Sequence, residues 1–201
     1  DIRSDDDDRM GLVFRFQDEE NFYAFSWDRE LNERALVRVH QGKEDVLMSD
    51  TVLYDPGTWY AVRITLEGNR IRCAIDGINV FDITDDAIQS GKTGLYNNGN
   101  DGGYFDNFIV MGSAGDTNEE NVFFSDAFEG DTIKTDWEFI RGTWTLSDGA
   151  MRQTDNYWEG DYPHSGGVFA LVGNTSMRDY TVSADIRSDD DDRMGLVFRF
   201  Q

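Results

Sequence analysis

Runs of consecutive carboxylates are the part of this sequence best suited to chemistry. Four aspartates in a row occur twice, at positions 5–8 and at positions 189–192. Adjacent carboxylates repel one another, and a hard cation such as calcium, bound by several oxygens at about 2.4 Å, relieves that repulsion. A solvated turn between two strands explains the same runs without a cation. The candidate calcium ligands are Asp5, Asp6, Asp7 and Asp8, with their duplicates Asp189, Asp190, Asp191 and Asp192.

An aromatic stretch at 156–164 is a second candidate binding site. It contains Tyr157, Trp158, Tyr162 and His164 together with two carboxylates. Such residues can stack on a sugar ring and hydrogen bond to its hydroxyl groups. They can also anchor a long loop on its own protein or contact a neighbouring repeat, and packing of this kind is the more common role of exposed aromatics. The stretch therefore predicts either a carbohydrate site or a packing contact.

The composition restricts the class of protein and its partners. The chain of 201 residues has a formal net charge of −22, and 13% of its residues are aromatic. The aromatic content favours a packed domain over a disordered acidic tail. The negative charge repels phosphate backbones and anionic lipid head groups, so we expect neither nucleic acid nor a membrane surface as a partner.

An exact internal duplication sets the organisation of the chain. Residues 1–17 recur without a mismatch at 185–201, an offset of 184 residues. We interpret the chain as a window on an array of near-identical tandem repeats. An engineered circular permutant with an overlap, and separate subunits that exchange the duplicated strand, are the two alternatives. Each explanation predicts that the natural domain does not begin at residue 1.

A small, polar stretch marks the predicted boundary between repeats. Residues 112–120 lack large apolar side chains, which is typical of a linker. Residues 1–111 are then the back part of one repeat, and 121–201 are the front part of the next. A linker of this length spans at most about 30 Å, so successive domains should touch.

Hydrophobic residues alternate with a period of two in short runs throughout the chain, separated by Gly and Asp turns such as those at 76–77 and 147–149. This pattern is typical of an all-β sandwich of two antiparallel sheets. One sandwich has a single place for the duplicated strand. The expected strands are 122–125, 137–140, 143–146, 150–154, 167–172, 180–187, 194–201 with its duplicate 10–17, 22–27, 35–40, 45–48, 59–66, 70–76, 78–83, 94–96 and 105–110.

Four segments together resemble the concanavalin A-like (laminin G-like) jelly roll, and more narrowly the thrombospondin carboxy-terminal module and related repeats of bacterial surface proteins. They are SDDDDRMGLVFRFQDEENFYAFSWD, PGTWYAVRITLEGNRIRCAIDG, SGKTGLY and YFDNFIV. The match covers nearly the whole repeat in permuted order. The resemblance implies a jelly roll, structural calcium, an extracellular or cell-surface location, and a role in adhesion or matrix.

The resemblance also implies a further calcium site, where the first and last strands of the repeat are neighbours. It suggests Asp126 with Glu129 after the first strand, and Asp106 in the last strand, as ligands. The alternative is that Asp106 and Asp126 cap turns by accepting hydrogen bonds from backbone N–H groups.

Catalytic patterns are missing from the sequence. We find no G-x-S-x-G elbow, no glycine-rich phosphate loop and no zinc pattern around either histidine. We therefore expect no enzyme. The leading hypothesis is a calcium-stabilised structural or adhesive repeat of a long extracellular filament or surface adhesin, with neighbouring copies of the repeat as partners. A lectin-like carbohydrate-binding module, with glycans as partners, is the alternative.

Overall fold

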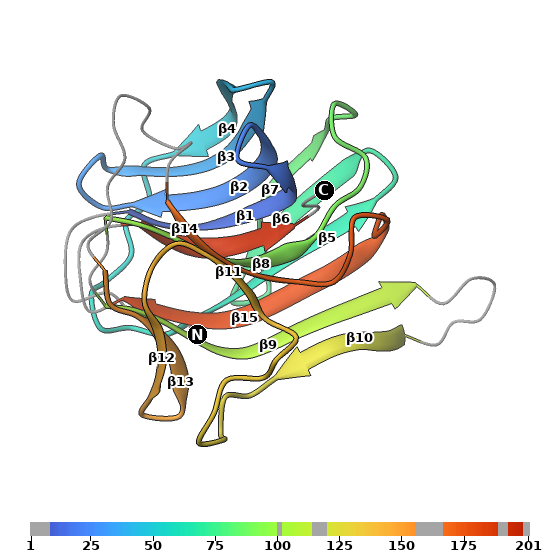
Figure 1. Cartoon of the computed structure of the whole chain (residues 1–201). Helices are drawn as coiled ribbons and strands as arrows, with labels where there is room; N and C mark the ends of the chain where they lie inside the picture. The colour runs from blue at the N-terminus through green and yellow to red at the C-terminus, as the bar shows by residue number, and fades with distance from the viewer. Residues whose placement is uncertain (1–8, 100–101, 114–119, 156–166, 189–192, 199–201) are drawn as a thin grey trace.

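The structure is a computed structural model, and it describes residues 9–99, 102–113, 120–155, 167–188 and 193–198. The described residues form an all-β fold of antiparallel strands in two sheets (Figure 1). The first sheet has the order β11 (Glu138–Ile140), β14 (Val168–Val172), β8 (Thr93–Asn98), β1 (Arg9–Asp18), β2 (Asn21–Asp28), β3 (Glu33–His40) and β4 (Lys43–Asp50), and β16 (Arg193–Phe198) pairs with β2 and β8. The second has the order β12 (Trp144–Ser147), β13 (Ala150–Gln153), β9 (Gly103–Ser113), β15 (Tyr180–Ser188), β5 (Tyr60–Glu67), β6 (Arg70–Ile75) and β7 (Ile78–Thr84), and β10 (Glu120–Asp126) pairs with β9.

Two-residue turns close the hairpins where the sequence predicts them. Asp76 and Gly77 join β6 to β7, and both have positive φ, 50° and 77°. Asp148 and Gly149 join β12 to β13 with φ of 55° and 76°. Paired positive φ values define the turn whose twist matches that of the flanking strands, and Asp-Gly adopts it readily. These turns set the register of their hairpins.

A common hydrophobic core lies between the sheets, as expected for a sandwich-like fold. Alternate residues of β2 and β5 supply it, for example Phe25 and Ile64, each with no exposed surface. Cys73 on β6 lies in the same core as a free, buried thiol. Burial raises the pKa of this thiol far above its usual value, because the thiolate would lose its hydration.

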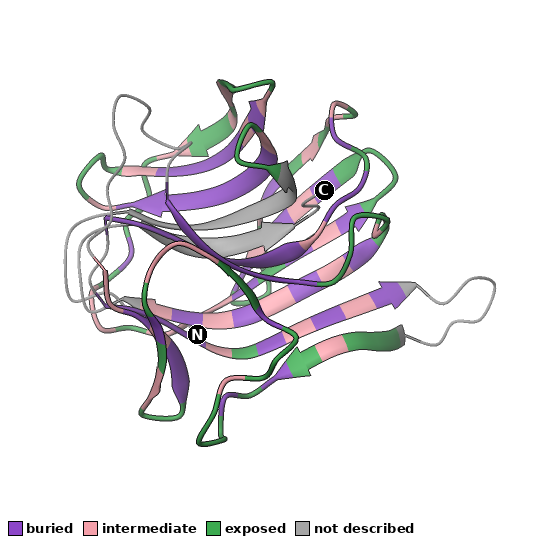
Figure 2. Cartoon of the chain, viewed as in Figure 1, coloured by how far each residue is buried: buried purple, intermediate pink, exposed green. Residues whose placement is uncertain are grey.

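Strands β2, β3, β8 and β14 of the first sheet are buried on both faces, which period-two alternation did not predict. On β2, Tyr23, Phe25 and Trp27 pack in the common core, whereas Phe22 and Ala24 belong to a separate apolar cluster. Because successive side chains of a strand point to opposite faces, this second cluster lies on the outer face of the sheet. Figure 2 shows the resulting band of buried residues along β2, β3 and β14. The second cluster consists of Phe22, Ala24, Ala35, Val37, Val39, Tyr96, Phe169 and Leu171.

The two copies of the duplicated segment occupy the same part of the first sheet. Met10 of β1 and Met194 of β16 are each paired with Trp27 of β2 and with Asn97 of β8. In Figure 1 the two copies, blue and red, lie together between these strands. Both copies therefore share one place in the first sheet of a single chain.

The parts of the chain before and after the predicted linker combine in both sheets. β9 runs to Ser113 and β10 begins at Glu120, and the two pair as an antiparallel hairpin. Strand pairing thus extends into both ends of the predicted linker, and residues 114–119 lie outside the described residues. The assignment of the two parts to successive repeats stays a prediction.

Replacing Ile64 with alanine should destabilise the protein far more than the same change at Ile78. Ile64 has no exposed surface, whereas Ile78 at the edge of the same sheet is 70% exposed. We expect Ile64→Ala to lower the free energy of unfolding by about 2–5 kcal/mol, and Ile78→Ala by less than about 1 kcal/mol. Urea unfolding measures both. Equal losses would contradict the placement of the core.

Candidate functional sites

Asp126, one of the predicted calcium ligands, is the last residue of β10 and is buried. It is 6% exposed, and its carboxylate accepts hydrogen bonds from Trp137 Nε1 at 2.9 Å and from the backbone N of Phe128 at 3.1 Å. Lys134 Nζ lies 3.3 Å from the same carboxylate. Phe128 has a φ of 50°, which the hydrogen bond to its N–H helps to hold. The hydrogen bond from the backbone N of Phe128 is the contact that the turn-capping alternative predicts. The role of Asp126 as a calcium ligand stays a prediction.

Asp106, the partner expected for Asp126, belongs to a different set of contacts. It lies in β9 directly opposite Asp185 of β15. Its Oδ1 accepts a hydrogen bond from the backbone N of Asn107 at 2.7 Å, and Asn107 Nδ2 donates to Asp185 Oδ2 at 2.7 Å. Asn107 has a φ of 48° and lies at a break in the β9–β15 register. Asn107 therefore bridges two carboxylates that would otherwise only repel each other.

The charge around Asp106 favours its protonated form. Burial raises the pKa of Asp106 above its usual range, and the backbone hydrogen bond from Asn107 opposes the rise. The negative charges of Asp185 and Glu129 raise the pKa further. A cation near these three side chains would relieve the same repulsion. Within the described ranges, however, no three or more His, Cys, Asp or Glu side chains are grouped so that they could hold a metal ion.

The other predicted site residues lie outside the described residues, so the structure does not place them. These are the two aspartate runs and the aromatic stretch: Asp5, Asp6, Asp7, Asp8, Asp189, Asp190, Asp191, Asp192, Tyr157, Trp158, Tyr162 and His164.

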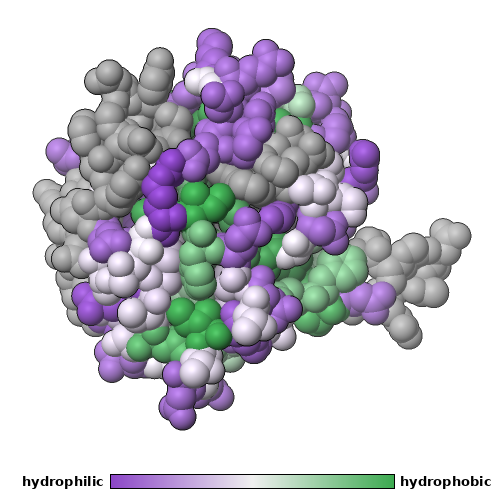
Figure 3. Space-filling model, in the orientation of Figure 1, coloured by the Kyte–Doolittle hydropathy of each residue, from purple (hydrophilic) through white to green (hydrophobic). Residues whose placement is uncertain are grey.

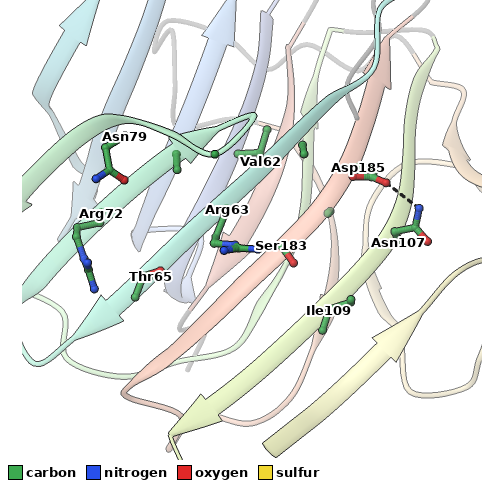
Figure 4. A pocket seen from close by; sticks show the side chains of 13 residues that line it. Val62, Arg63, Thr65, Arg72, Asn79, Asn107, Ile109, Ser183 and Asp185 are labelled. Atoms are coloured by element: carbon green, nitrogen blue, oxygen red, sulfur yellow. Dashed lines mark hydrogen bonds between the residues drawn. The ribbon is translucent and has the colours of Figure 1, made fainter. Parts of the chain in front are cut away.

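A polar groove of about 400 Å³ crosses the outer face of the second sheet (Figure 4). Arg63 on β5, Arg72 on β6, and Ser183 and Asp185 on β15 line it beside Asn107. These side chains alternate along their strands with core residues, so period-two alternation could have predicted their face. It could not have predicted the hollow, which depends on side-chain lengths across five neighbouring strands. None of the described residues that line the groove is aromatic, so it offers hydrogen bonds to a ligand without a stacking surface.

Comparison with known proteins does not identify a relative. No known protein family matches the chain, and no curated protein matches it. Among the residues that the structure describes, no helix has the length and hydrophobicity needed to cross a bilayer.

Asp106→Asn should stabilise the protein at neutral pH in the presence of a chelator. The raised pKa means that the folded state binds a proton more tightly than the unfolded state does, so wild-type stability falls as the pH rises above the ordinary carboxyl value of 3.8. Asparagine removes this penalty and keeps an oxygen that can accept from Asn107. The advantage should disappear below that pH, because Asp106 is then protonated in both states.

Thermal melts between pH 3 and pH 8 measure the difference. Asp148→Asn is the matched control, since it removes one charge from an exposed turn that is distant from Asp106 in the sequence. If Asp106→Asn melts at or below the wild-type temperature at pH 7, burial and the neighbouring charges of Asp185 and Glu129 do not destabilise the Asp106 carboxylate.

Proposed function

We propose that this chain is the repeat unit of a long extracellular filament or surface adhesin, a calcium-stabilised jelly roll that assembles end to end. The observation that carries the proposal is the duplication of residues 1–17 at 185–201, combined with one place in the fold for the duplicated strand. In a continuous array each period contributes one copy of the strand and one place for it in the first sheet. Every sandwich in the array is then complete.

A hydrophobic surface beside the predicted linker supports contact between successive repeats. Val122 and Phe123 on β10 are each 58% exposed, directly after that linker. Figure 3 shows hydrophobic surface at this edge of the molecule. A hollow of about 670 Å³ lies beside it, lined by Phe123, Met177 and Arg178 among others. Exposed apolar residues next to a hollow are typical of a contact surface, and a short linker brings the next repeat to it.

The charge supports calcium and an extracellular location. The chain has 40 acidic and only 18 basic side chains, so basic side chains alone cannot neutralise it. Such an excess of carboxylates destabilises the compact state through self-repulsion unless ions bind or screen them. Extracellular calcium modules bind the ion at about 10⁻⁴–10⁻³ M, which suits secreted proteins.

Calcium should raise the melting temperature of the chain. A bound ion stabilises the folded state by about 2.7 kcal/mol at a hundredfold excess over its Kd, which corresponds to several degrees for a domain of this size. Differential scanning calorimetry with calcium, with magnesium and with chelator measures the effect. A transition that is the same in calcium and in chelator would remove calcium from the proposal.

Lengthening the chain by one period of 184 residues should add one complete sandwich. We expect the unfolding enthalpy to double approximately, because each period supplies a full set of strands. We also expect the maximum dimension in small-angle scattering to grow by one domain length, as in a rod. Phe123→Ser should loosen the junction and broaden the distance distribution, whereas Ile78→Ser, at the opposite edge of the second sheet, should not. An added period that stays unfolded would refute the array.

A further inference from the structure

The slot between β2 and β8 receives both copies of the duplicated strand in the same register. Ala24 of β2 is paired with Val13 of β1 and with Val197 of β16, which are equivalent residues of the duplication. Tyr23 of β2 is likewise paired with the equivalent phenylalanines of the two copies. A backbone edge can form one ladder of hydrogen bonds with one neighbouring strand. β1 and β16 are therefore alternative occupants of one slot.

The two copies use the two walls of the slot differently. β1 pairs with β2 over most of its length and meets β8 only at Met10, opposite Asn97. β16 pairs with β8 from Arg193 to Val197 and meets β2 at three positions. β1 reaches the slot through the tight turn to β2, whereas β16 follows β15 of the other sheet. Either strand can thus enter from its own side.

We propose that the β2–β8 slot is an interaction surface that accepts this strand from a second copy of the chain. When one copy fills the slot, the other copy has no partner strand in that slot. The two copies have the same sequence. A strand from another chain consequently offers the slot the same side chains and the same backbone pairing as its own strand. The proposed array supplies the biological setting, but the slot can be tested in the single chain.

Tethering is the one advantage of the chain's own strands. A short tether acts like a local concentration in the millimolar range, so a resident strand excludes a foreign one at low protein concentration. Once both resident strands are disabled, the slot should take up a foreign strand readily. Strand addition of this kind obtains its affinity from main-chain hydrogen bonds and its specificity from alternate side chains.

Proline substitutions in the full chain test the proposal. Val13→Pro and Val197→Pro each remove one backbone donor and break the ladder in one copy. We expect each single variant to melt within about 3 °C of the wild type, because the intact copy fills the slot. The double variant should melt at least about 10 °C lower or lose its cooperative transition. Val13→Ala with Val197→Ala is the control, since alanine keeps both backbone donors, and it should melt well above the double proline variant.

A synthetic peptide with the sequence of residues 193–201 tests acceptance from another molecule. Refolding the double proline variant from urea with a molar excess of this peptide should restore the cooperative transition and yield a one-to-one complex in native mass spectrometry. A scrambled peptide should do neither.

Three results would overturn the proposal. The copies are not interchangeable if one proline alone lowers the melting temperature as much as both prolines together. The slot is unnecessary if the double variant melts like the wild type. Acceptance from a second copy is wrong if neither the peptide nor excess wild-type chain restores the double variant during refolding. None of these results depends on the lengthened chain, so failure of the array and failure of the slot are distinguishable.

Discussion

A backbone edge bonds to only one neighbouring strand at a time, and the first sheet depends on this constraint. β2 and β8 belong to one sheet only when a strand lies between them, because each already has another neighbour on its far side, β3 and β14 respectively. Removal of that strand would divide the sheet into two parts and leave two rows of N–H and C=O groups without partners. The slot is therefore the point at which the fold is completed, and the sequence supplies two identical strands for it.

The stability of the first sheet depends on the strand between β2 and β8 for a second reason, the burial of its neighbours. Side chains from both faces of β2 are buried, Tyr23 and Phe25 in the common core and Phe22 and Ala24 in the outer cluster. A sheet that is buried on both faces loses apolar contacts on both when a central strand leaves it. The second sheet differs, because its outer face carries polar groups such as Arg63 and Asp185 around the groove.

Electrostatic repulsion opposes this compact arrangement, and local pairing offsets part of it. Arg34 holds Asp50 with two hydrogen bonds at the edge of the first sheet, and Arg70 holds Asp82 in the same way at the edge of the second. Asp106 is hydrogen bonded by Asn107 instead, and burial is the main cause of its raised pKa. The chain thus combines strong apolar packing with acidic sites that a cation would stabilise.

The sequence alone determined the all-β class, most strand positions, the Asp76-Gly77 and Asp148-Gly149 turns and the duplication, because period-two alternation and turn chemistry are local properties. Only the tertiary structure decided that β2 is buried on both faces, since local alternation does not show what covers each face. It also decided the partners of Asp106 and Asp126. Strand order brings Asp185 opposite Asp106, and the loop that follows β10 brings Trp137 to Asp126. Neither contact follows from the local alternation of the sequence. The duplication already predicted one place for two copies, and strand pairing identified that place as the position between β2 and β8.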